Sequence, residues 1–240
     1  MDKTSKDKTR SNRRPWLQGM AQAVPIVLGY IPVGFAYGVL AQKAGLSAFN
    51  TLLMSIIVYA GSAQLIVVGL ISSGMAPLSI IITTFIVNLR HMLMSAALSP
   101  HLQSWRKPEL AVFAYELTDE SFALHATRMD GQERPKSETL AINMTAQASW
   151  VLGTAIGIYG GQMIAEIEPF ALDYALPAMF IALLVMQIKN KVQVLVAVLA
   201  GALSLGFYLL GFQQWYVIIA TVLAASLGVV VEKWIKQPSS

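Results

Sequence analysis

The sequence contains no cysteine, which excludes disulfides, cysteine-ligated zinc and thiol catalysis. It is also poor in charge: Asp, Glu, Lys and Arg make up 12% of its 240 residues, against about 25% in soluble domains. Hydrophobic residues make up 55%, and the mean hydropathy is +0.58. These values predict an all-α, polytopic integral membrane protein embedded in a lipid bilayer.

Several chemical motifs are also missing. The chain has no G-x-x-x-x-G-K-[ST], no H-E-x-x-H and no G-x-S-x-G, so the commonest nucleotide, metal and serine-hydrolase signals are absent. Its three histidines (His91, His101, His125) are too scattered to define a metal site. We therefore expect no enzyme, no metal, no cofactor and no nucleic-acid partner.

What is present is organised around the apolar stretch from Leu78 to Ser99, with Asn88, Arg90 and His91 at its centre. A helix of about 22 residues crosses the hydrocarbon layer and would place Arg90 near the bilayer midplane. An ionised guanidinium there costs several kcal/mol unless it is paired. Asn88 and His91 share one helical face and Arg90 points elsewhere, so we expect this helix to be enclosed by protein or interrupted.

Two preceding spans carry helix-breaking residues. Leu17–Gln42 contains Pro25 and Pro32 and is not expected to form one regular helix; a proline-kinked packing helix is the alternative. The second span, Thr51–Leu70, is interrupted by Gly61-Ser62-Ala63-Gln64. Broken helices of this kind are tolerated in a protein interior or beside a cavity.

The next segment, Glu109–Thr127, reads as a helix on which Glu116, Asp119 and Glu120 form one carboxylate patch. It either crosses the membrane or lies on the surface as an amphipathic helix. If it crosses, there are about eight spans, with thirteen Lys and Arg on the cytosolic side and three outside. If it does not cross, six lie inside and ten outside, so the positive-inside rule favours the crossing. We expect Arg90 to pair with a carboxylate of this patch.

The remaining spans complete the expected organisation. Thr139–Ala165 carries Gly153, Gly157 and Gly161, a small-residue face that predicts close packing against another helix, in this chain or a partner. Its polar Asn143 and Gln147 share a face and are expected to line the same interior, while Trp150 falls away from the aromatic belts. Residues 174–188, 192–211 and 212–231 form three further spans.

Residues 1–15 are predicted to be a disordered, basic, cytosolic tail, and residues 16–236 a transmembrane transporter domain. Interrupted or short spans in both halves hint at an inverted repeat. A polar interior in such a protein points to secondary transport.

Four motifs resemble the AzlC family, the large permease subunit of bacterial branched-chain amino acid exporters. They are Gly29-Tyr30-Ile31-Pro32-Val33-Gly34-Phe35-Ala36-Tyr37-Gly38, Ala60-Gly61-Ser62-Ala63-Gln64, Asn88-Leu89-Arg90-His91 and Leu117-Thr118-Asp119-Glu120-Ser121-Phe122. The resemblance implies export of valine, leucine, isoleucine or similar substrates such as methionine. It also implies a small AzlD-type membrane subunit, proton coupling and a place in the cytoplasmic (inner) membrane.

The expected substrate and proton pathway rests on physical reasoning, because a zwitterion needs an anionic group, hydrogen-bond donors and an apolar wall. Its candidate residues are Asp119, Glu120, Glu116, Arg90, Asn88, His91, Gln64, Ser62, Gly61, Tyr30 and Pro32. The alternative is a non-transporting membrane scaffold or a passive channel for small zwitterions. A scaffold would not need a carboxylate cluster and an arginine both at membrane depth.

Overall fold

The computed structural model describes residues 15–129, 134–161, 163, 190–211 and 216–236, with isolated positions between 174 and 188. Its described elements are helices. The predicted tail and most of the predicted span 174–188 lie outside the described residues. The chain divides into two compact units, Met1–Phe180 and Ile181–Ser240, which are described separately.

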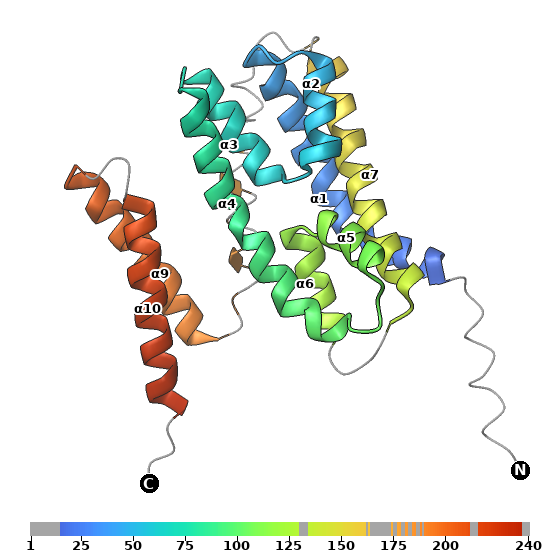
Figure 1. Cartoon of the computed structure of the whole chain (residues 1–240). Helices are drawn as coiled ribbons and strands as arrows, with labels where there is room; N and C mark the ends of the chain where they lie inside the picture. Colours follow the sequence, from blue (N-terminus) through green and yellow to red (C-terminus); the bar gives the residue numbers. More distant parts are fainter. Residues whose placement is uncertain are drawn as a thin grey trace, which may run out of the picture. The chain divides into compact units, whose positions relative to one another are not determined.

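The first unit begins with a long helix followed by a helical hairpin. Helix α1 (Pro15–Lys43) runs from the lower to the upper end of the unit in Figure 1. The short α2 (Ala48–Leu53) and the π-helix η2 (Met54–Val58) return to its middle, and α3 (Gly61–Ser72) leads back to the upper end. We call α2, η2 and α3 the first hairpin.

A second hairpin enters from the opposite end. Helix α4 (Pro77–Leu98) descends to the lower end, where the 3₁₀ turn η3 (Ser99–His101) follows. Then α5 (Lys107–Tyr115) rises to the middle and α6 (Asp119–Arg128) returns, and we call these two helices the second hairpin.

The doubling back of the second hairpin is visible in its side-chain contacts. The rings of Phe113 and His125 lie 5.3 Å apart, whereas twelve residues of straight helix would separate them by about 18 Å. At the base, Lys136 Nζ lies 2.5 Å from Glu109 Oε2, so the start of α5 and the start of the following helix are neighbours. The predicted crossing by Glu109–Thr127 is therefore wrong.

The span predicted over Thr51–Leu70 is also a hairpin and not a crossing. The break was predicted near Gly61, and it lies at Tyr59–Ala60, just before α3. Gln64 Nε2 donates to Ser55 Oγ at 3.2 Å across this turn. Two of the eight expected spans thus fold back on themselves, and the eight-span count is not confirmed.

Helix α7 (Lys136–Gly161) completes the first unit and runs parallel to α1. Gly153 lies against Ile31 so closely that an added Cβ would meet the Ile31 carbonyl oxygen at 2.6 Å, and Gly157 lies even closer to the Phe35 carbonyl oxygen. The predicted close packing of the glycine face is confirmed, and its partner is α1 of the same chain.

Helix α1 is unbroken through Pro25 and Pro32, so the expectation of an irregular first span is wrong. Each proline removes one helical hydrogen bond. The helix is nevertheless held along most of its length by α7, from Gly19 beside Ala141 to Val39 beside Gly161. The packing of α1 against α7 therefore outweighs the free-energy cost of the helical hydrogen bonds that the two prolines remove.

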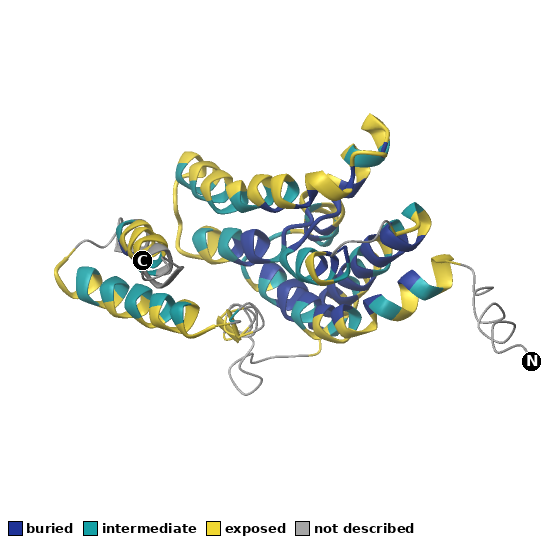
Figure 2. Cartoon of the chain, turned by 90° about the horizontal axis from the view of Figure 1, so that it is seen from below, coloured by how far each residue is buried: buried dark blue, intermediate teal, exposed yellow. Residues whose placement is uncertain are grey.

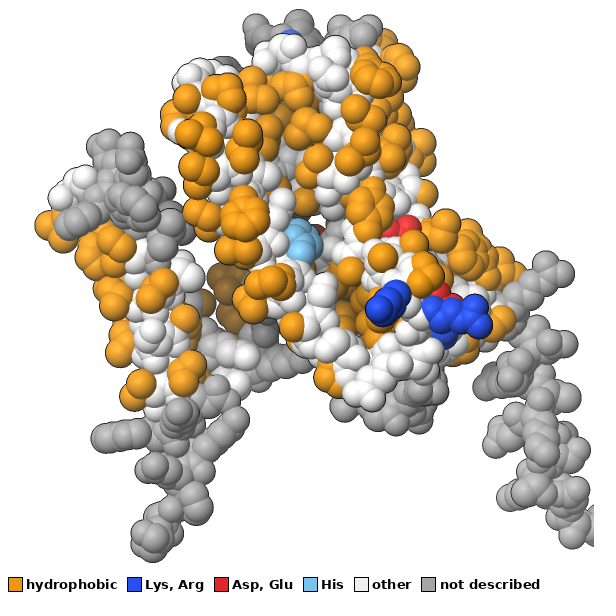
Figure 3. All heavy atoms as spheres, viewed as in Figure 1, with side chains coloured by type: hydrophobic (Ala, Val, Ile, Leu, Met, Phe, Trp, Pro, Cys, Tyr) orange, Lys and Arg blue, Asp and Glu red, His pale blue; other side chains and the backbone are white. Residues whose placement is uncertain are grey.

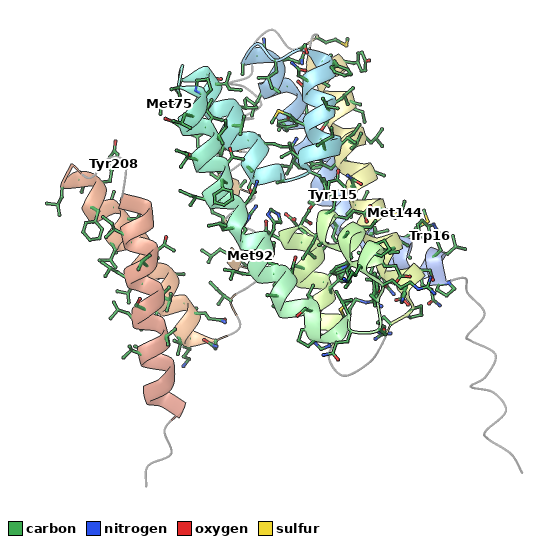
Figure 4. All side chains as sticks on the ribbon, in the orientation of Figure 1. Trp16, Met75, Met92, Tyr115, Met144 and Tyr208 are labelled. Atoms are coloured by element: carbon green, nitrogen blue, oxygen red, sulfur yellow. The ribbon has the colours of Figure 1, made fainter. Side chains whose placement is uncertain are left out.

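Helix α4 differs from its expectation in another way. It is continuous, and among the described residues its buried side chains are Met94 and Leu98, so it is neither interrupted nor enclosed. Its polar centre (Asn88, Arg90, His91) is half-buried, whereas the remaining surface is apolar and exposed, as Met92 in Figure 4 illustrates.

Within the first unit, two consecutive groups of elements follow the same order but run in opposite directions. A rising α1 is followed by a hairpin from the upper end, and a descending α4 is followed by a hairpin from the lower end. This is the order that an inverted repeat requires. It falls within residues 15–128 and not in the two halves of the chain.

The buried core of the first unit lies where α1, α7 and the hairpins meet, in dark blue in Figure 2. In the second unit, α9 (Lys191–Leu209) and α10 (Tyr216–Lys236) pack against each other, which confirms the two helices predicted there. Among the described residues, three helices are long and apolar enough to cross a membrane: α1, α4 with η3, and α9.

Candidate functional site

The site is built where the tips of the two hairpins meet. The first tip is Tyr59-Ala60, where the π-helical turn of η2 ends and Tyr59 takes the left-handed conformation with φ 38°. The second tip is the short break between α5 and α6. Tyr115, labelled in Figure 4, donates from this tip to the carbonyl of Ile56 at the first tip.

A pocket lies between these tips, with one wall from α1, α4 and α7. Its lining residues are Tyr30, Tyr59, Ala60, Gly61, Ser62, Arg90, His91, Thr118, Asp119, Glu120 and Trp150. The free space holds about one water molecule, which is too little for an amino acid. The hairpins are therefore closed around the pocket in this structure.

Arg90 connects α4 to both hairpins. Its Nη1 lies 2.8 Å from Asp119 Oδ2, and its Nη2 donates to Ser62 Oγ. The Arg90 and Asp119 side chains are 25% and 14% exposed. The predicted pairing of Arg90 with a carboxylate is confirmed, with Asp119 as the partner. The Arg90 Nε is buried and has no hydrogen-bond partner among the described residues.

Glu120 is held by a different residue. Tyr30 of α1 donates its hydroxyl to Glu120 Oε2 at 2.5 Å and lies 2.7 Å from Thr118 Oγ1. The two neighbouring carboxylates thus have distinct surroundings, since Asp119 faces a cation and Glu120 faces a neutral phenol.

Trp150 forms the buried wall of the pocket and supports the first hairpin. Its ring lies edge-on to Tyr30, with centroids 5.4 Å apart, and its Nε1 donates to Gln64 Oε1 at 3.1 Å. Ser55 and Thr154 extend this network through hydroxyl oxygens 2.8 Å apart. A Cβ at Gly61 would meet the Trp150 ring at 2.8 Å, so a larger residue here would require this buried ring to move.

The two helices that begin at the pocket differ at their first turns. Helix α6 is capped by Thr118, whose Oγ1 accepts from Ser121 N–H, and it carries Asp119 and Glu120 in its first turn. Helix α3 begins after Ala60, which supplies no side-chain cap. Its first amide groups have no intrahelical acceptor and give this end a partial positive charge.

The structure brings together seven of the predicted pathway residues, on the four helices α1, α3, α4 and α6. These are Tyr30, Gly61, Ser62, Arg90, His91, Asp119 and Glu120. Gln64 stands behind them as a support of Trp150.

Three other predicted residues do not line the pocket: Pro32, Asn88 and Glu116. Pro32 is exposed on α1. Glu116 was placed on one helical face with Asp119, but the chain breaks between them, so that shared face does not exist. Asn143 and Gln147 do not share an interior either: Asn143 Oδ1 pairs with His125 Nε2 at 2.8 Å in the core, and Gln147 donates to Ile56.

Sequence reasoning missed Tyr59, Ala60, Thr118 and Trp150 as lining residues. For Thr118 a signal was present, because a threonine followed by two acidic residues and a serine is a helix start. The displacement of Trp150 from the aromatic belts was a weaker sign that it serves the interior.

The re-entrant hairpins, the apolar helices and the enclosed charges define a polytopic helical membrane protein. Residues 25–164 match the family described as AzlC protein. The chain is 33% identical over 196 residues to the inner membrane protein YgaZ of Escherichia coli K12, covering 79% of this chain and 80% of that one. It is 32% identical over 219 residues to an uncharacterized membrane protein of Archaeoglobus fulgidus, covering 90% and 94%.

The branched-chain amino acid transport protein AzlC of Bacillus subtilis 168 is 27% identical over 171 residues, covering 70% of this chain and 66% of that one. The chain belongs to the AzlC family, a family of membrane proteins with a transport role. No solved structure matches it.

Proposed function

We propose that this protein is a secondary transporter that exports branched-chain amino acids. The observation that carries the proposal is the position of the pocket, between two hairpin tips that come from opposite ends of the unit. Withdrawing one hairpin opens the pocket to one side and withdrawing the other opens it to the opposite side. This is the requirement of alternating access around a central site.

The pocket offers the groups that an apolar amino acid needs. Asp119 and Glu120 provide negative charge for its ammonium group, and Arg90 provides positive charge. Trp150 and Tyr30 provide an apolar wall for a valine, leucine, isoleucine or methionine side chain. The relative from Bacillus subtilis bears the name of a branched-chain amino acid transport protein, which supports this choice of substrate.

Coupling to protons fits the unequal surroundings of the two carboxylates. Arg90 holds Asp119 as a counter-ion, whereas Glu120 has no cation within ion-pair distance among the described residues. We assign the exchangeable proton to Glu120 first and to Asp119 second. Proton binding at Glu120 would then compete with the substrate ammonium, so that inward proton flow drives export.

The orientation follows from the basic residues at the two ends of the first unit. The lower end carries five of them, at the bases of the second hairpin and α7, as the blue side chains in Figure 3 illustrate: Arg106, Lys107, Arg128, Arg134 and Lys136. The upper end carries Lys43. Helix α1 begins at the lower end, and the sequence that precedes Pro15 is also basic. By the positive-inside rule we expect this end on the cytosolic side of the inner membrane.

A small AzlD-type subunit completes the proposal. The outer face of α4 exposes large apolar side chains, among them Leu78, Ile82 and Phe85, and α9 is also exposed. Lipid and a small membrane subunit share these surfaces in the proposed assembly. The subunit is proposed to be of the AzlD type because of the resemblance to the AzlC family.

The direct test is uptake of labelled valine into everted membrane vesicles, in which export appears as accumulation. Vesicles with this protein and its subunit should accumulate valine when energised and lose that accumulation when a protonophore is added. Vesicles from cells without the protein are the control. Equal uptake in both preparations would overturn the proposal, and uptake that stops at equal concentrations would identify a passive channel.

A further inference from the structure

Tyr59 has a buried hydroxyl that makes no hydrogen bond of normal geometry, with the Tyr30 hydroxyl close by. The residue is 2% exposed and lines the pocket, and its Oη makes no hydrogen bond to the described residues. The neighbouring Tyr30 hydroxyl donates a hydrogen bond to Glu120. A buried hydroxyl without an acceptor is destabilising, so this group is suited to an acceptor that arrives from outside.

The start of α3 adds donors beside this hydroxyl. Tyr59 and Ala60 directly precede this 12-residue helix, whose N-terminus has no side-chain cap. Gly61 and Ser62 line the pocket, and their amides have no intrahelical acceptor. Arg90 lies beside Ser62 with its Nε unpaired among the described residues. Hydroxyl, amide and guanidinium donors therefore converge on the first hairpin tip.

The second hairpin tip has the opposite character. Helix α6 begins after the N-cap Thr118, which accepts from the Ser121 amide, and its first turn carries the negative charges of Asp119 and Glu120. One tip thus presents donors and the other presents acceptors, across a pocket with little free space.

We infer that the substrate carboxylate binds the first hairpin tip, at Tyr59 and the start of α3, while the ammonium group binds the second tip. This inference rests on the proposed function, because it orients the amino acid in the same pocket. An anion at a helix N-terminus is a common form of carboxylate recognition. The zwitterion then bridges the two hairpins, and a ligand that lacks the carboxylate cannot hold them together.

The test compares valine with valinamide, which keeps the ammonium group and the side chain but loses the carboxylate charge. In vesicles, valinamide should compete with labelled valine at least tenfold more weakly than unlabelled valine. The Tyr59→Phe variant should raise the half-saturating valine concentration roughly tenfold, as expected for loss of a hydrogen bond to a charged group. The Tyr37→Phe variant is the matched control, since its buried hydroxyl lies outside the pocket near Met54 Sδ.

The same comparison is made on purified protein, by the rise in thermal midpoint that each ligand produces. Valine should stabilise the wild type and the Tyr37→Phe variant, while valinamide and the Tyr59→Phe variant show little effect. Valinamide that competes as well as valine, or unchanged valine affinity in folded Tyr59→Phe protein, would overturn the inference. Failure of wild-type vesicles to accumulate valine would instead count against the proposed function, and the binding measurement would still decide the orientation.

Discussion

The glycine contact between α1 and α7 gives the sharpest structural prediction. A Cβ at Gly157 would lie 2.9 Å from the Phe35 carbonyl carbon, inside van der Waals distance of a backbone that cannot rotate away. Alanine in a helix interior normally gains about 1 kcal/mol over glycine. Overpacking costs about 1–3 kcal/mol, so Gly157→Ala should destabilise and Gly157→Leu should prevent correct packing.

Gly69 is the matched control, because a Cβ there would have nothing within 4 Å. Gly69→Ala should therefore leave the thermal midpoint of the detergent-purified protein unchanged or raise it. The measurement is the fraction of protein that stays in the monodisperse gel-filtration peak after heating. The expected order is Gly69→Ala, wild type, Gly157→Ala, then Gly157→Leu. Equal midpoints for the two alanine variants would refute the reasoning, as would a well-assembled Gly157→Leu protein that has lost transport.

Two further predictions concern the charges and the topology. Asp119→Asn leaves Arg90 without its counter-ion and should lower the unfolding free energy by about 1–3 kcal/mol. Adding Arg90→Gln should recover part of that loss, which a double-mutant cycle measures. Strictly additive losses would contradict the pairing. Because the chain has no cysteine, single Ser→Cys variants report topology cleanly: cysteines at Ser104 and Ser137 should react with a membrane-impermeant maleimide from the cytosolic side and one at Ser73 from the other. Labelling of Ser104→Cys and Ser137→Cys from opposite sides would restore the crossing segment and contradict the second hairpin.

Much of the fold was readable because each feature had a local cause. Low charge and high hydropathy predicted the membrane class, and the glycine spacing at Gly153 and Gly157 predicted close helix packing. The cost of burying an isolated guanidinium predicted a partner for Arg90, and the structure supplies Asp119. These are consequences of the residues themselves and depend little on the tertiary arrangement.

The re-entrant hairpins were not predictable in the same way, because an apolar broken helix reads alike whether it crosses or returns. The return of α6 is set by long-range contacts, namely Phe113 with His125, His125 with Asn143, and Glu109 with Lys136. No local pattern encodes these pairs. Each hairpin that is counted as a crossing reverses the side assigned to the chain after it. Two such reversals cancel for the residues after α6, so the cytosolic N-terminus stays a prediction under either count.

The site residues also divide into those that a local cause made predictable and those whose place depends on the tertiary structure. Arg90 was chosen because a charge at membrane depth has to be compensated, whereas Tyr30 and Ser62 were chosen as parts of the two spans expected to be broken. Glu116 was chosen on the assumption of an unbroken helix, and the break at the second tip removed that basis. Tyr59 was passed over because its role depends on a left-handed backbone turn that its sequence neighbours do not announce.

The measurement that tests the central claim most directly compares driven export with exchange in the separate variants Asp119→Asn and Glu120→Gln. Labelled valine is followed in energised everted vesicles and, separately, in vesicles loaded with valine at equal concentrations on both sides. We expect Glu120→Gln to lose accumulation against a gradient and to keep a measurable exchange, because its site no longer trades a proton for the substrate ammonium. Normal accumulation by both variants would contradict the account and move the proton to another group, with His91 the next candidate at the pocket.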